Sequence, residues 1–405
     1  HFPDSVPVNT FTDIYIDYIN NMTYDFTNFS ERLITPEKVE WATFSMKPYK
    51  ACGGDGVRIV CLQKTFNIIK RFLIDILRGM IRWGFVPDAL MKTRVIFIPK
   101  PGRPDYTDPK SLRPISLCSV IIKILEKIID RYIRETKLSI RPLHPLQYAY
   151  MEGKSVEGAL HNLVGHLEKL VFTGDCATAI FFDIGGAFDN LSWPAIQTAL
   201  DGRGVETPLI MWCKSYLLNR TITCDLGNVS KSYKVQRGTP QGGALSPLLW
   251  CLVVDDLVKT LADLCYHSQF FADDGVAIIR GTNSNEIIRE ARTILTVLEE
   301  WCQNRGLFIN PSKIEIISFT RKRRVPQIEG LSFMNSELTP TNKVKYLGVM
   351  VDSKLNWKSH IEWKSKKITN SLFCARKAIG KKWGITPKIA IWIYKAIILP
   401  RLLFG

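Results

Sequence analysis

The sequence predicts an α+β fold in which an antiparallel sheet is backed by helices on one face. Three observations lead to this expectation. Short runs of β-branched and aromatic residues, such as residues 178–184 (TAIFFDI), have the length and composition of strands. They mix irregularly with amphipathic segments whose apolar residues recur every three or four positions, as in helices. The chain of 405 residues is 46% apolar, which is enough for a folded protein with a large core.

The first part of the chain predicts helices around one hairpin. Thr35 and Pro36 have residue types preferred at a helix N-cap and first turn, so a helix is expected from position 36. Apolar periodicity predicts further helices over residues 60–83 and 120–137. Between them, a β-branched run at 95–98, a polar loop rich in Pro and Gly, and a second short apolar run predict a basic hairpin.

From residue 177 onward, strands and helices follow each other in a different order. Residues 178–184 are a predicted buried strand that ends at Gly185 and Gly186, and Ser192 is the expected cap of the next helix. The other expected elements are a hairpin turning at Gly227–Asn228, a helix over 244–264, a hairpin over 269–280, a helix over 284–306, strands over 313–319 and 344–352, and basic helices after residue 358.

The charge balance indicates a polyanionic partner. The chain has 54 Lys and Arg against 38 Asp and Glu, a net charge of +16. Such a surplus favours nucleic acid, because binding releases counterions from phosphates, although a merely basic soluble protein has the same balance. The ten cysteines form no CxxC or Cys/His cluster, so neither zinc nor a disulfide framework is expected. No apolar run reaches the roughly 18 residues of a membrane span, so no membrane partner is expected.

Paired carboxylates are the first candidate for chemistry. The stretch QFFADDGVAIIR places Asp273 and Asp274 side by side at the tip of a predicted hairpin, and Asp183 ends the predicted strand of FFDIGG. Adjacent strands of one sheet would bring these carboxylates within reach of one metal centre, and two Mg²⁺ ions there would support phosphoryl transfer. The structural alternative is that Asp-Gly is simply a favourable turn sequence.

A glycine-rich loop is the second candidate. The segment VQRGTPQGGALSPLLW surrounds Gln241 with glycines and leads into a predicted helix. Gly242 and Gly243 permit a substrate backbone or base to pass close to the chain, and Gln241 offers both a hydrogen-bond donor and an acceptor. The alternative is an ordinary loop before a helix.

The order of these motifs, completed by GLFINPSK and YLG, resembles the reverse transcriptase of non-LTR retrotransposons. The segments AFDN and RGTPQGGALSPLLW are most similar to those of the jockey-like insect branch, and the resemblance runs from about residue 47 to the end. It implies a right-hand polymerase with a palm sheet. We expect an extension ahead of the fingers at 1–85, fingers at 86–175, the palm at 176–345, and the primer grip and start of the thumb at 346–405.

The resemblance implies a metal centre in the palm. Asp183, Asp273 and Asp274 are the expected catalytic and metal-binding side chains, with Asp273 as the second metal ligand beside Asp183 and Asp274 as its weaker companion. Ile184 is expected to offer its backbone carbonyl to the same ions. The expected cofactor is a pair of Mg²⁺ ions, with Mn²⁺ as a substitute.

The resemblance also implies contacts with the nucleotide and the primer. Phe188 matches the aromatic gate that excludes a sugar 2′-hydroxyl, Lys100 and Arg113 would hold the triphosphate, and Lys313 would protonate the departing pyrophosphate. Structural alternatives remain open for three of them: a core ring at Phe188, a solvated Lys100 and a salt-bridged Lys313. Gln241 completes the expected nucleotide contacts. The expected template and primer contacts are Gly242, Gly243, Tyr346, Leu347 and Gly348.

One motif departs from the pattern of the family. Where the family reads close to QxGFxxGRST, this chain has QYAYMEGKSV, with Ala149 in place of a glycine, Lys154 at the basic position and Val156 in place of a threonine. The departure concerns template handling more than the chemistry.

The function implied by the resemblance is RNA-directed DNA synthesis by nucleotidyl transfer onto a primer 3′-hydroxyl, which in an intact element is target-primed reverse transcription. The expected partners are template RNA, a DNA primer, deoxynucleoside triphosphates and other domains of the same polyprotein, with an endonuclease outside this fragment. The expected location is the nucleus, at the site of integration. Two alternatives remain: a catalytically inactive RNA-binding derivative, and an intron-maturase-like reverse transcriptase.

Overall fold

The computed structural model describes residues 26–226, 229–322, 325–377 and 384–404. The chain divides into two compact units. The first contains His1–Pro145, Gly185–Lys259 and Trp301–Phe308, and the second contains Leu146–Ile184, Thr260–Glu300 and Ile309–Gly405.

The first unit is mainly helical. Its helices are α2 (Thr27–Leu33), α3 (Pro36–Phe44), α4 (Ile59–Arg82), α5 (Asp88–Met91), α6 (Val120–Tyr132), α7 (Leu138–Ile140), α9 (Ala187–Asn190), α10 (Trp193–Gly202), α11 (Thr207–Leu218) and most of α12 (Ser246–Asp263). The predicted cap of α3 is confirmed, because the Thr35 side chain accepts from the Lys38 N–H. Ser192 does precede α10, but its side chain makes no capping hydrogen bond.

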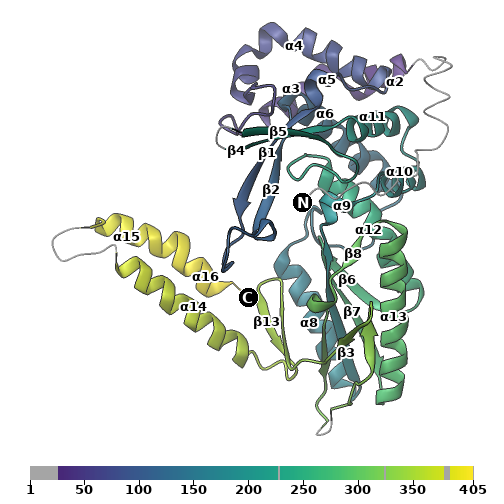
Figure 1. The fold of residues 1–405 in the computed structure, drawn as a ribbon, viewed down its shortest axis with the longest axis vertical. Coiled ribbons are helices and arrows are strands. Elements are labelled where there is room, and N and C mark those ends of the chain that lie inside the picture. The colour runs from purple at the N-terminus through teal and green to yellow at the C-terminus, as the bar shows by residue number, and fades with distance from the viewer. Residues whose placement is uncertain (1–25, 227–228, 323–324, 378–383, 405) are drawn as a thin grey trace. The chain divides into compact units, whose positions relative to one another are not determined.

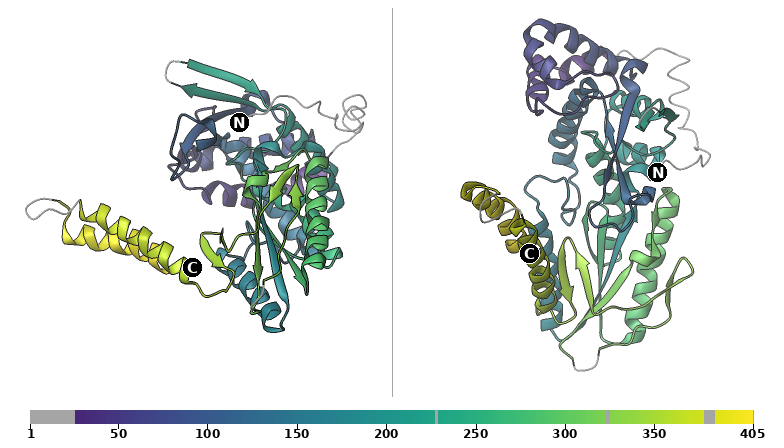
Figure 2. Two further views of the ribbon diagram at one scale, coloured as in Figure 1. Left: turned by 60° about the horizontal axis from the view of Figure 1, so that its bottom comes forward. Right: turned by 60° about the vertical axis from the view of Figure 1, so that its left-hand side comes forward.

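A four-stranded sheet completes the first unit. Its order is β2 (Leu112–Leu117), β1 (Lys92–Pro99), β4 (Thr221–Leu226) and β5 (Val229–Lys234). The two hairpins, β1–β2 and β4–β5, are antiparallel, and β1 joins them by pairing with β4 in parallel. Figure 2 shows the β4–β5 hairpin as a long ribbon. Its predicted turn at Gly227–Asn228 lies outside the described residues.

The second unit contains the sheet that positions the acidic residues. The strand order is β6 (His267–Phe271), β7 (Asp274–Gly281), β3 (Cys176–Gly185) and β8 (Phe308–Ile309), and β9 (Glu315–Phe319) also pairs with β3. β3 is antiparallel to both β7 and β9, and β6 is antiparallel to β7 (Figure 1). The predicted α+β class, with an antiparallel sheet and helices, is confirmed.

Both faces of β3 are buried, so the expectation that helices cover one face of the sheet was too narrow. On one face, Ala177, Ala179 and Phe181 join a core formed with α8 (Val156–Phe172) and neighbouring strands. On the other face, Ile180 and Ile184 are also fully buried. The continuous apolar run of β3 is typical of a strand covered on both sides. α13 (Ser284–Asn304) runs alongside the sheet in Figure 1.

In the described residues, small hairpins and helices form the C-terminal part of the second unit. They are β10 (Leu331–Phe333) with β11 (Ser336–Leu338), β12 (Lys343–Tyr346) with β13 (Val349–Asp352), and α14 (Lys358–Arg376), α15 (Pro387–Ile393) and α16 (Leu399–Leu403). The predicted single strand over 344–352 is therefore wrong, because the chain turns back between Tyr346 and Val349. Figure 2 shows α14 and α15 running side by side. None of the described helices has both the length and the apolar character needed to cross a bilayer.

Candidate active site

Asp183 and Asp274 lie directly opposite each other in the central sheet. In the antiparallel register of β3 and β7, Asp183 pairs with Asp274 as the last pair of the ladder. Opposed Cα atoms in such a pair are about 4.5–5.5 Å apart. Two carboxylates that are 91 positions apart in sequence are thus cross-strand neighbours.

The tight turn beside this pair consists of Ala272 and Asp273. Phe271 pairs with Asp274 across the β6–β7 hairpin, so the turn comes two residues earlier than a turn centred on Asp274 and Gly275 would. Ala272 has φ +57°, a left-handed conformation that is unusual for alanine and strained. The carbonyl of Asp273 accepts the N–H of Ile184 at 3.0 Å, which ties the turn to the end of β3.

Gly275 is therefore a strand residue, and packing explains why it is a glycine. A Cβ atom at this position would lie 2.4 Å from ring carbons of Phe182. The rings of Phe182 and Phe270 meet edge to face, with centroids 5.6 Å apart, and fill the space beside the glycine. The Asp-Gly turn interpretation is wrong, and the glycine instead lets an aromatic ring pack against the strand that carries Asp274.

The electrostatics of the pair favour a cation. Burial, followed by the negative charges of Asp273 and Asp183, raises the pKa of Asp274 to about 7, and the positive charge of Lys313 partly opposes this shift. The Lys313 ammonium donates to Asp183 Oδ2. Lys313 reaches Asp183 from the short 3₁₀ turn η3 (Pro311–Lys313), which the Asn310 side chain caps.

The donor set suits a divalent cation, since carboxylate oxygens are the hard ligands that Mg²⁺ and Mn²⁺ prefer. An ammonium already binds Asp183, and like charges face each other across the ladder, so a positive ion would relieve the repulsion. In the part of the chain that the structure describes, no group of three or more acidic, His or Cys side chains is arranged to enclose a metal ion. The fit to a metal therefore depends on the opposed pair, with Asp273 beside it.

The predicted primer residues lie in the same unit, on the β12–β13 hairpin. Tyr346 is only 4% exposed, and its ring lies 5.2 Å from that of Phe181, centroid to centroid. Burial raises the pKa of Tyr346. Leu347 and Gly348 form the two-residue turn with φ +45° and +85°, and a Cβ at Gly348 would be 3.0 Å from the Phe404 ring. Of these three residues, Leu347 and Gly348 are the more exposed, whereas Tyr346 is a core residue.

Phe188, Gln241, Gly242 and Gly243 lie in the first unit. Phe188 is half-buried on α9, with its ring 6.2 Å from that of Trp250, and its carbonyl accepts the Thr239 N–H at 2.7 Å. At both glycines the space for a Cβ is filled by the protein: Cβ atoms would lie 2.7 Å from the Ser116 carbonyl oxygen at Gly242 and 2.7 Å from Ser246 Oγ at Gly243. Close packing within the unit is thus sufficient to explain both glycines, and a template contact there stays a prediction.

Lys100 and Arg113 lie on the β1–β2 hairpin of the first unit. Arg113 is exposed on β2, opposite Ile98 of β1. Lys100 follows β1, and its ammonium donates to the Lys110 carbonyl at 2.9 Å. The hairpin thus presents both cations from one segment, and the triphosphate role of each stays a prediction.

Three charged residues around Gln241, two of them buried and Asp189 half-buried, were missed by the sequence analysis. Asp189 accepts from Gln241 Nε2 at 2.6 Å, the Glu126 carboxylate accepts the N–H of Ala244 at 2.9 Å, and Arg220 donates to the Gly238 carbonyl at 3.2 Å. Only Asp189 carried a signal, since it belongs to the AFDN motif. Glu126 and Arg220 stand in sequence stretches that look like an ordinary amphipathic helix and strand.

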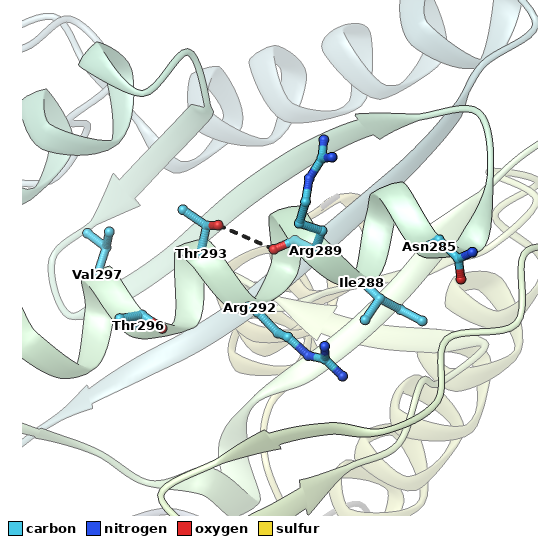
Figure 3. A pocket seen from close by; sticks show the side chains of 7 residues that line it. All are labelled: Asn285, Ile288, Arg289, Arg292, Thr293, Thr296 and Val297. Carbon is cyan, nitrogen blue, oxygen red and sulfur yellow. Dashed lines mark hydrogen bonds between the residues drawn. The ribbon is translucent and has the colours of Figure 1, made fainter.

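A depression on the outer side of α13 contains none of the predicted residues. Arg289 bonds to Glu290 at 2.7 Å, and Arg292 donates to the Gly330 carbonyl at 3.1 Å, so both arginines already have partners within the unit. The residues that line the depression, shown in Figure 3, are Asn285, Ile288, Arg289, Arg292, Thr293, Thr296 and Val297. This surface carries no argument for a catalytic site.

The sequence matches that of known proteins over most of its length. Residues 98–351 match the family described as reverse transcriptase (RNA-dependent DNA polymerase). The chain is 27% identical over 385 residues to the probable RNA-directed DNA polymerase from transposon BS of Drosophila melanogaster, covering 92% of this chain and 42% of that protein. It is 26% identical over 383 residues to the RNA-directed DNA polymerase from mobile element jockey of Drosophila funebris, covering 92% of this chain and 41% of that protein.

A solved structure of apo telomerase from Candida tropicalis, truncated from its C-terminal domain, aligns with a TM-score of 0.47 at 14% identity, covering 76% of this chain and 62% of that one. The chain spans about two fifths of the length of the two insect relatives. The family match covers more than half of the chain and includes the opposed aspartates. The chain belongs to the reverse transcriptase (RNA-dependent DNA polymerase) family.

Proposed function

We propose that this chain is the RNA-directed DNA polymerase of a non-LTR retrotransposon and extends a primer 3′-hydroxyl with deoxynucleoside triphosphates. The observation that carries the proposal is the opposed pair Asp183 and Asp274, in a chain that belongs to the reverse transcriptase family. In this proposal, residues 86–175 are the fingers, 176–345 the palm and 346–405 the primer grip and start of the thumb.

Asp183 and Asp274, with Asp273 beside them, would hold two Mg²⁺ ions, or Mn²⁺ in their place. Bound divalent ions lower the pKa of an attacking hydroxyl and stabilise the charge on a leaving pyrophosphate. Lys313, which bonds to Asp183, would supply a proton to that leaving group. Lys100 and Arg113 would bind the triphosphate, and Arg113 would do so through its planar guanidinium.

The proposed partners are template RNA and a DNA primer, held as a hybrid. The net charge of +16 supports a polyanionic partner. In the intact element, we propose that other domains of the same polyprotein supply the nick in target DNA, so that copying begins at the integration site in the nucleus.

Primer extension tests the polymerase directly. The protein is incubated with poly-rA/oligo-dT, dTTP and Mg²⁺, beside the Asp274→Asn variant. We expect the wild type to incorporate dTTP and Asp274→Asn to lose at least roughly 100-fold in rate, because that carboxylate would hold a metal ion. Asp225→Asn is the matched control, since Asp225 is an exposed acid paired with Arg94 at 3.0 Å. Equal rates for the wild type and Asp274→Asn would reject the proposal.

The same assay tests the sugar gate. Phe188→Ala should let the enzyme incorporate UTP on poly-rA, because the ring would no longer exclude a 2′-hydroxyl. Unchanged selectivity between dTTP and UTP would remove Phe188 from this role.

A further inference from the structure

The loop that carries Gln241 is fixed at several points within its unit. The Ser116 N–H donates to the Gln241 carbonyl at 2.7 Å, and the Ala244 N–H donates to the buried carboxylate of Glu126 at 2.9 Å. Gly242 has φ +122°, a conformation that only glycine adopts readily, and any Cβ there would meet the Ser116 carbonyl. The backbone at Gln241 is therefore held in place before any substrate binds.

The side chain of Gln241 is held as well. Its Nε2 donates to Asp189 Oδ2 at 2.6 Å, a short bond of the kind made to ionised acceptors. An ionised carboxylate can only accept hydrogen bonds, whereas an amide has one end that donates and one that accepts. Asp189 therefore selects one of the two amide orientations, with Nε2 toward the carboxylate and Oε1 away from it.

Asp189 is itself built into a rigid corner. Its N–H donates to the Gly186 carbonyl at 3.0 Å. Gly238 packs so closely on it that a Cβ there would lie 2.4 Å from the Asp189 carbonyl oxygen. These contacts fix the backbone of Asp189, so its carboxylate can move relative to Gln241 only by rotation of the side chain.

Asp189 is mostly ionised at neutral pH, although its surroundings raise its pKa above the ordinary value. Burial raises its pKa to about 6, while the hydrogen bond from Gln241 and the positive charge of Arg220 oppose that rise. Arg220 is only 3% exposed and donates to the Gly238 carbonyl. A buried arginine beside the same corner thus supplies the countercharge.

We propose that Asp189 is a positioning residue that fixes the polarity of the Gln241 amide, so that Gln241 meets the incoming nucleotide as a hydrogen-bond acceptor. This inference rests on the proposed polymerase function. It assigns the aspartate of AFDN to nucleotide recognition through Gln241, and the ligand is a nucleoside triphosphate that offers a hydrogen-bond donor to Oε1.

Three variants of the full chain test the inference in the poly-rA/oligo-dT assay. Asp189→Asn replaces an acceptor with a group that both donates and accepts, so the Gln241 amide can adopt either orientation. We expect the KM for dTTP to rise about tenfold, the effect of one lost hydrogen bond, with kcat changed less than about twofold. Gln241→Glu places two carboxylates face to face, and kcat/KM should fall by about 100-fold.

The third variant exchanges the two groups. In Asp189→Asn/Gln241→Glu, the amide introduced at position 189 donates to the carboxylate introduced at position 241, whose second oxygen remains an acceptor for the nucleotide. The exchange should recover at least about tenfold in kcat/KM relative to Gln241→Glu alone. Asp201→Asn, at an exposed acid of the same unit, is the matched control and should leave the KM for dTTP unchanged.

The readouts separate positioning from stability. The inference predicts that the KM for dTTP changes while the affinity for the primer-template and the melting temperature do not. An active wild type whose KM for dTTP is unaffected by Asp189→Asn, or an exchange variant no better than Gln241→Glu, would overturn the inference and leave the polymerase proposal standing. A wild type that incorporates no dTTP would overturn both.

Discussion

Asp183 and Asp274 face each other as the last pair of the β3–β7 ladder. Directly opposed like charges destabilise an antiparallel pair, and here burial adds to the effect. The opposed carboxylates therefore lower the stability of the metal-free protein. This relationship makes stability and activity respond in opposite directions when one of the two charges is removed.

Asp274→Asn should raise the stability of the metal-free protein by about 1–3 kcal/mol while it abolishes polymerisation. The amide keeps the size of the carboxyl but removes a half-buried negative charge that faces Asp183. Urea unfolding in EDTA measures the change, and Asp225→Asn, at an exposed ion pair, should alter stability by less than about 1 kcal/mol. A loss of stability in Asp274→Asn would contradict the interpretation.

Lys313→Gln should strengthen the binding of Mn²⁺ while slowing polymerisation. The Lys313 ammonium competes with a cation for Asp183, and the pair is partly exposed, with 51% of the lysine side chain accessible. An ion pair of this kind contributes about 1 kcal/mol or less, so the affinity should rise roughly three- to fivefold. Loss of the proposed proton donor should lower the rate by about 10²-fold.

Titration calorimetry with Mn²⁺ measures the affinity in this experiment. Arg280→Gln is the control, because Arg280 is exposed and forms an ion pair with Asp175 at 2.8 Å in the same unit. If Mn²⁺ binding weakens in Lys313→Gln, the lysine supports the metal site and does not compete with it.

Gly275→Ala should destabilise the protein by roughly 2 kcal/mol or more and reduce activity. The added methyl group would overlap the Phe182 ring and displace the strand beside Asp274. Phe182→Leu in the same chain should recover part of the loss, because the smaller side chain vacates the space. Gly79→Ala is the matched control: nothing lies within 4 Å of its Cβ position on α4, so that variant should gain about 0.5–1 kcal/mol.

Chemical denaturation of the four proteins decides this prediction. If Gly275→Ala is as stable as the wild type, the glycine is not required by the Phe182 ring. A Gly275→Ala/Phe182→Leu double variant no more stable than Gly275→Ala would show that some other contact is responsible.

Lys214→Met should stabilise the protein at neutral pH. Lys214 is 6% exposed on α11, and burial lowers its pKa to about 8. The unfolded chain keeps the proton up to its ordinary pKa of 10.5, so between about pH 8 and 10.5 the unfolded state binds more protons and the wild type gains stability as pH rises. Below pH 8 the lysine is charged in both states, and the full cost of burying its ammonium lowers the free energy of unfolding by roughly 2–3 kcal/mol.

The comparison of Lys214→Met with the wild type by urea unfolding at pH 7 and pH 9.5 isolates this group. The stability advantage of the variant should be largest at pH 7 and shrink at pH 9.5. An advantage that stays constant across this range would attribute the effect to packing and not to charge.

Much of the fold could be predicted from sequence, because local patterns determine it. Strand β3, the β6–β7 hairpin and helices α4 and α13 follow from apolar runs and from three- and four-residue periodicity. The apolar pattern of residues 344–352 predicted one strand and did not reveal the turn, because Leu347 is the first turn residue. Leucine seldom adopts φ +45°, so the sequence contains no turn signal until Gly348.

The acidic pair could be anticipated because each carboxylate stands where a strand ends. The partners of Gln241 could not, since 52 residues separate Asp189 from Gln241 and 118 separate Glu126 from Ala244. Tertiary packing alone brings these groups together, and a helix such as α6 buries Glu126 among apolar residues whose pattern does not distinguish it. The need for glycine at position 275 could not be predicted from sequence either, because the Phe182 ring that fills the space beside it belongs to another strand.

The pairing of β3 with β7 also limits how this sequence can change in length. Side chains alternate between the two faces of a strand, so one residue inserted between Ile180 and Asp183 would turn the carboxylate to the opposite side of the sheet while leaving every acidic residue in place. Insertions and deletions should therefore be excluded from these two strands and confined to connections such as the one between β1 and β2. A variant that keeps all three aspartates but has one residue inserted between Ile180 and Asp183 should therefore lose the proposed polymerase activity.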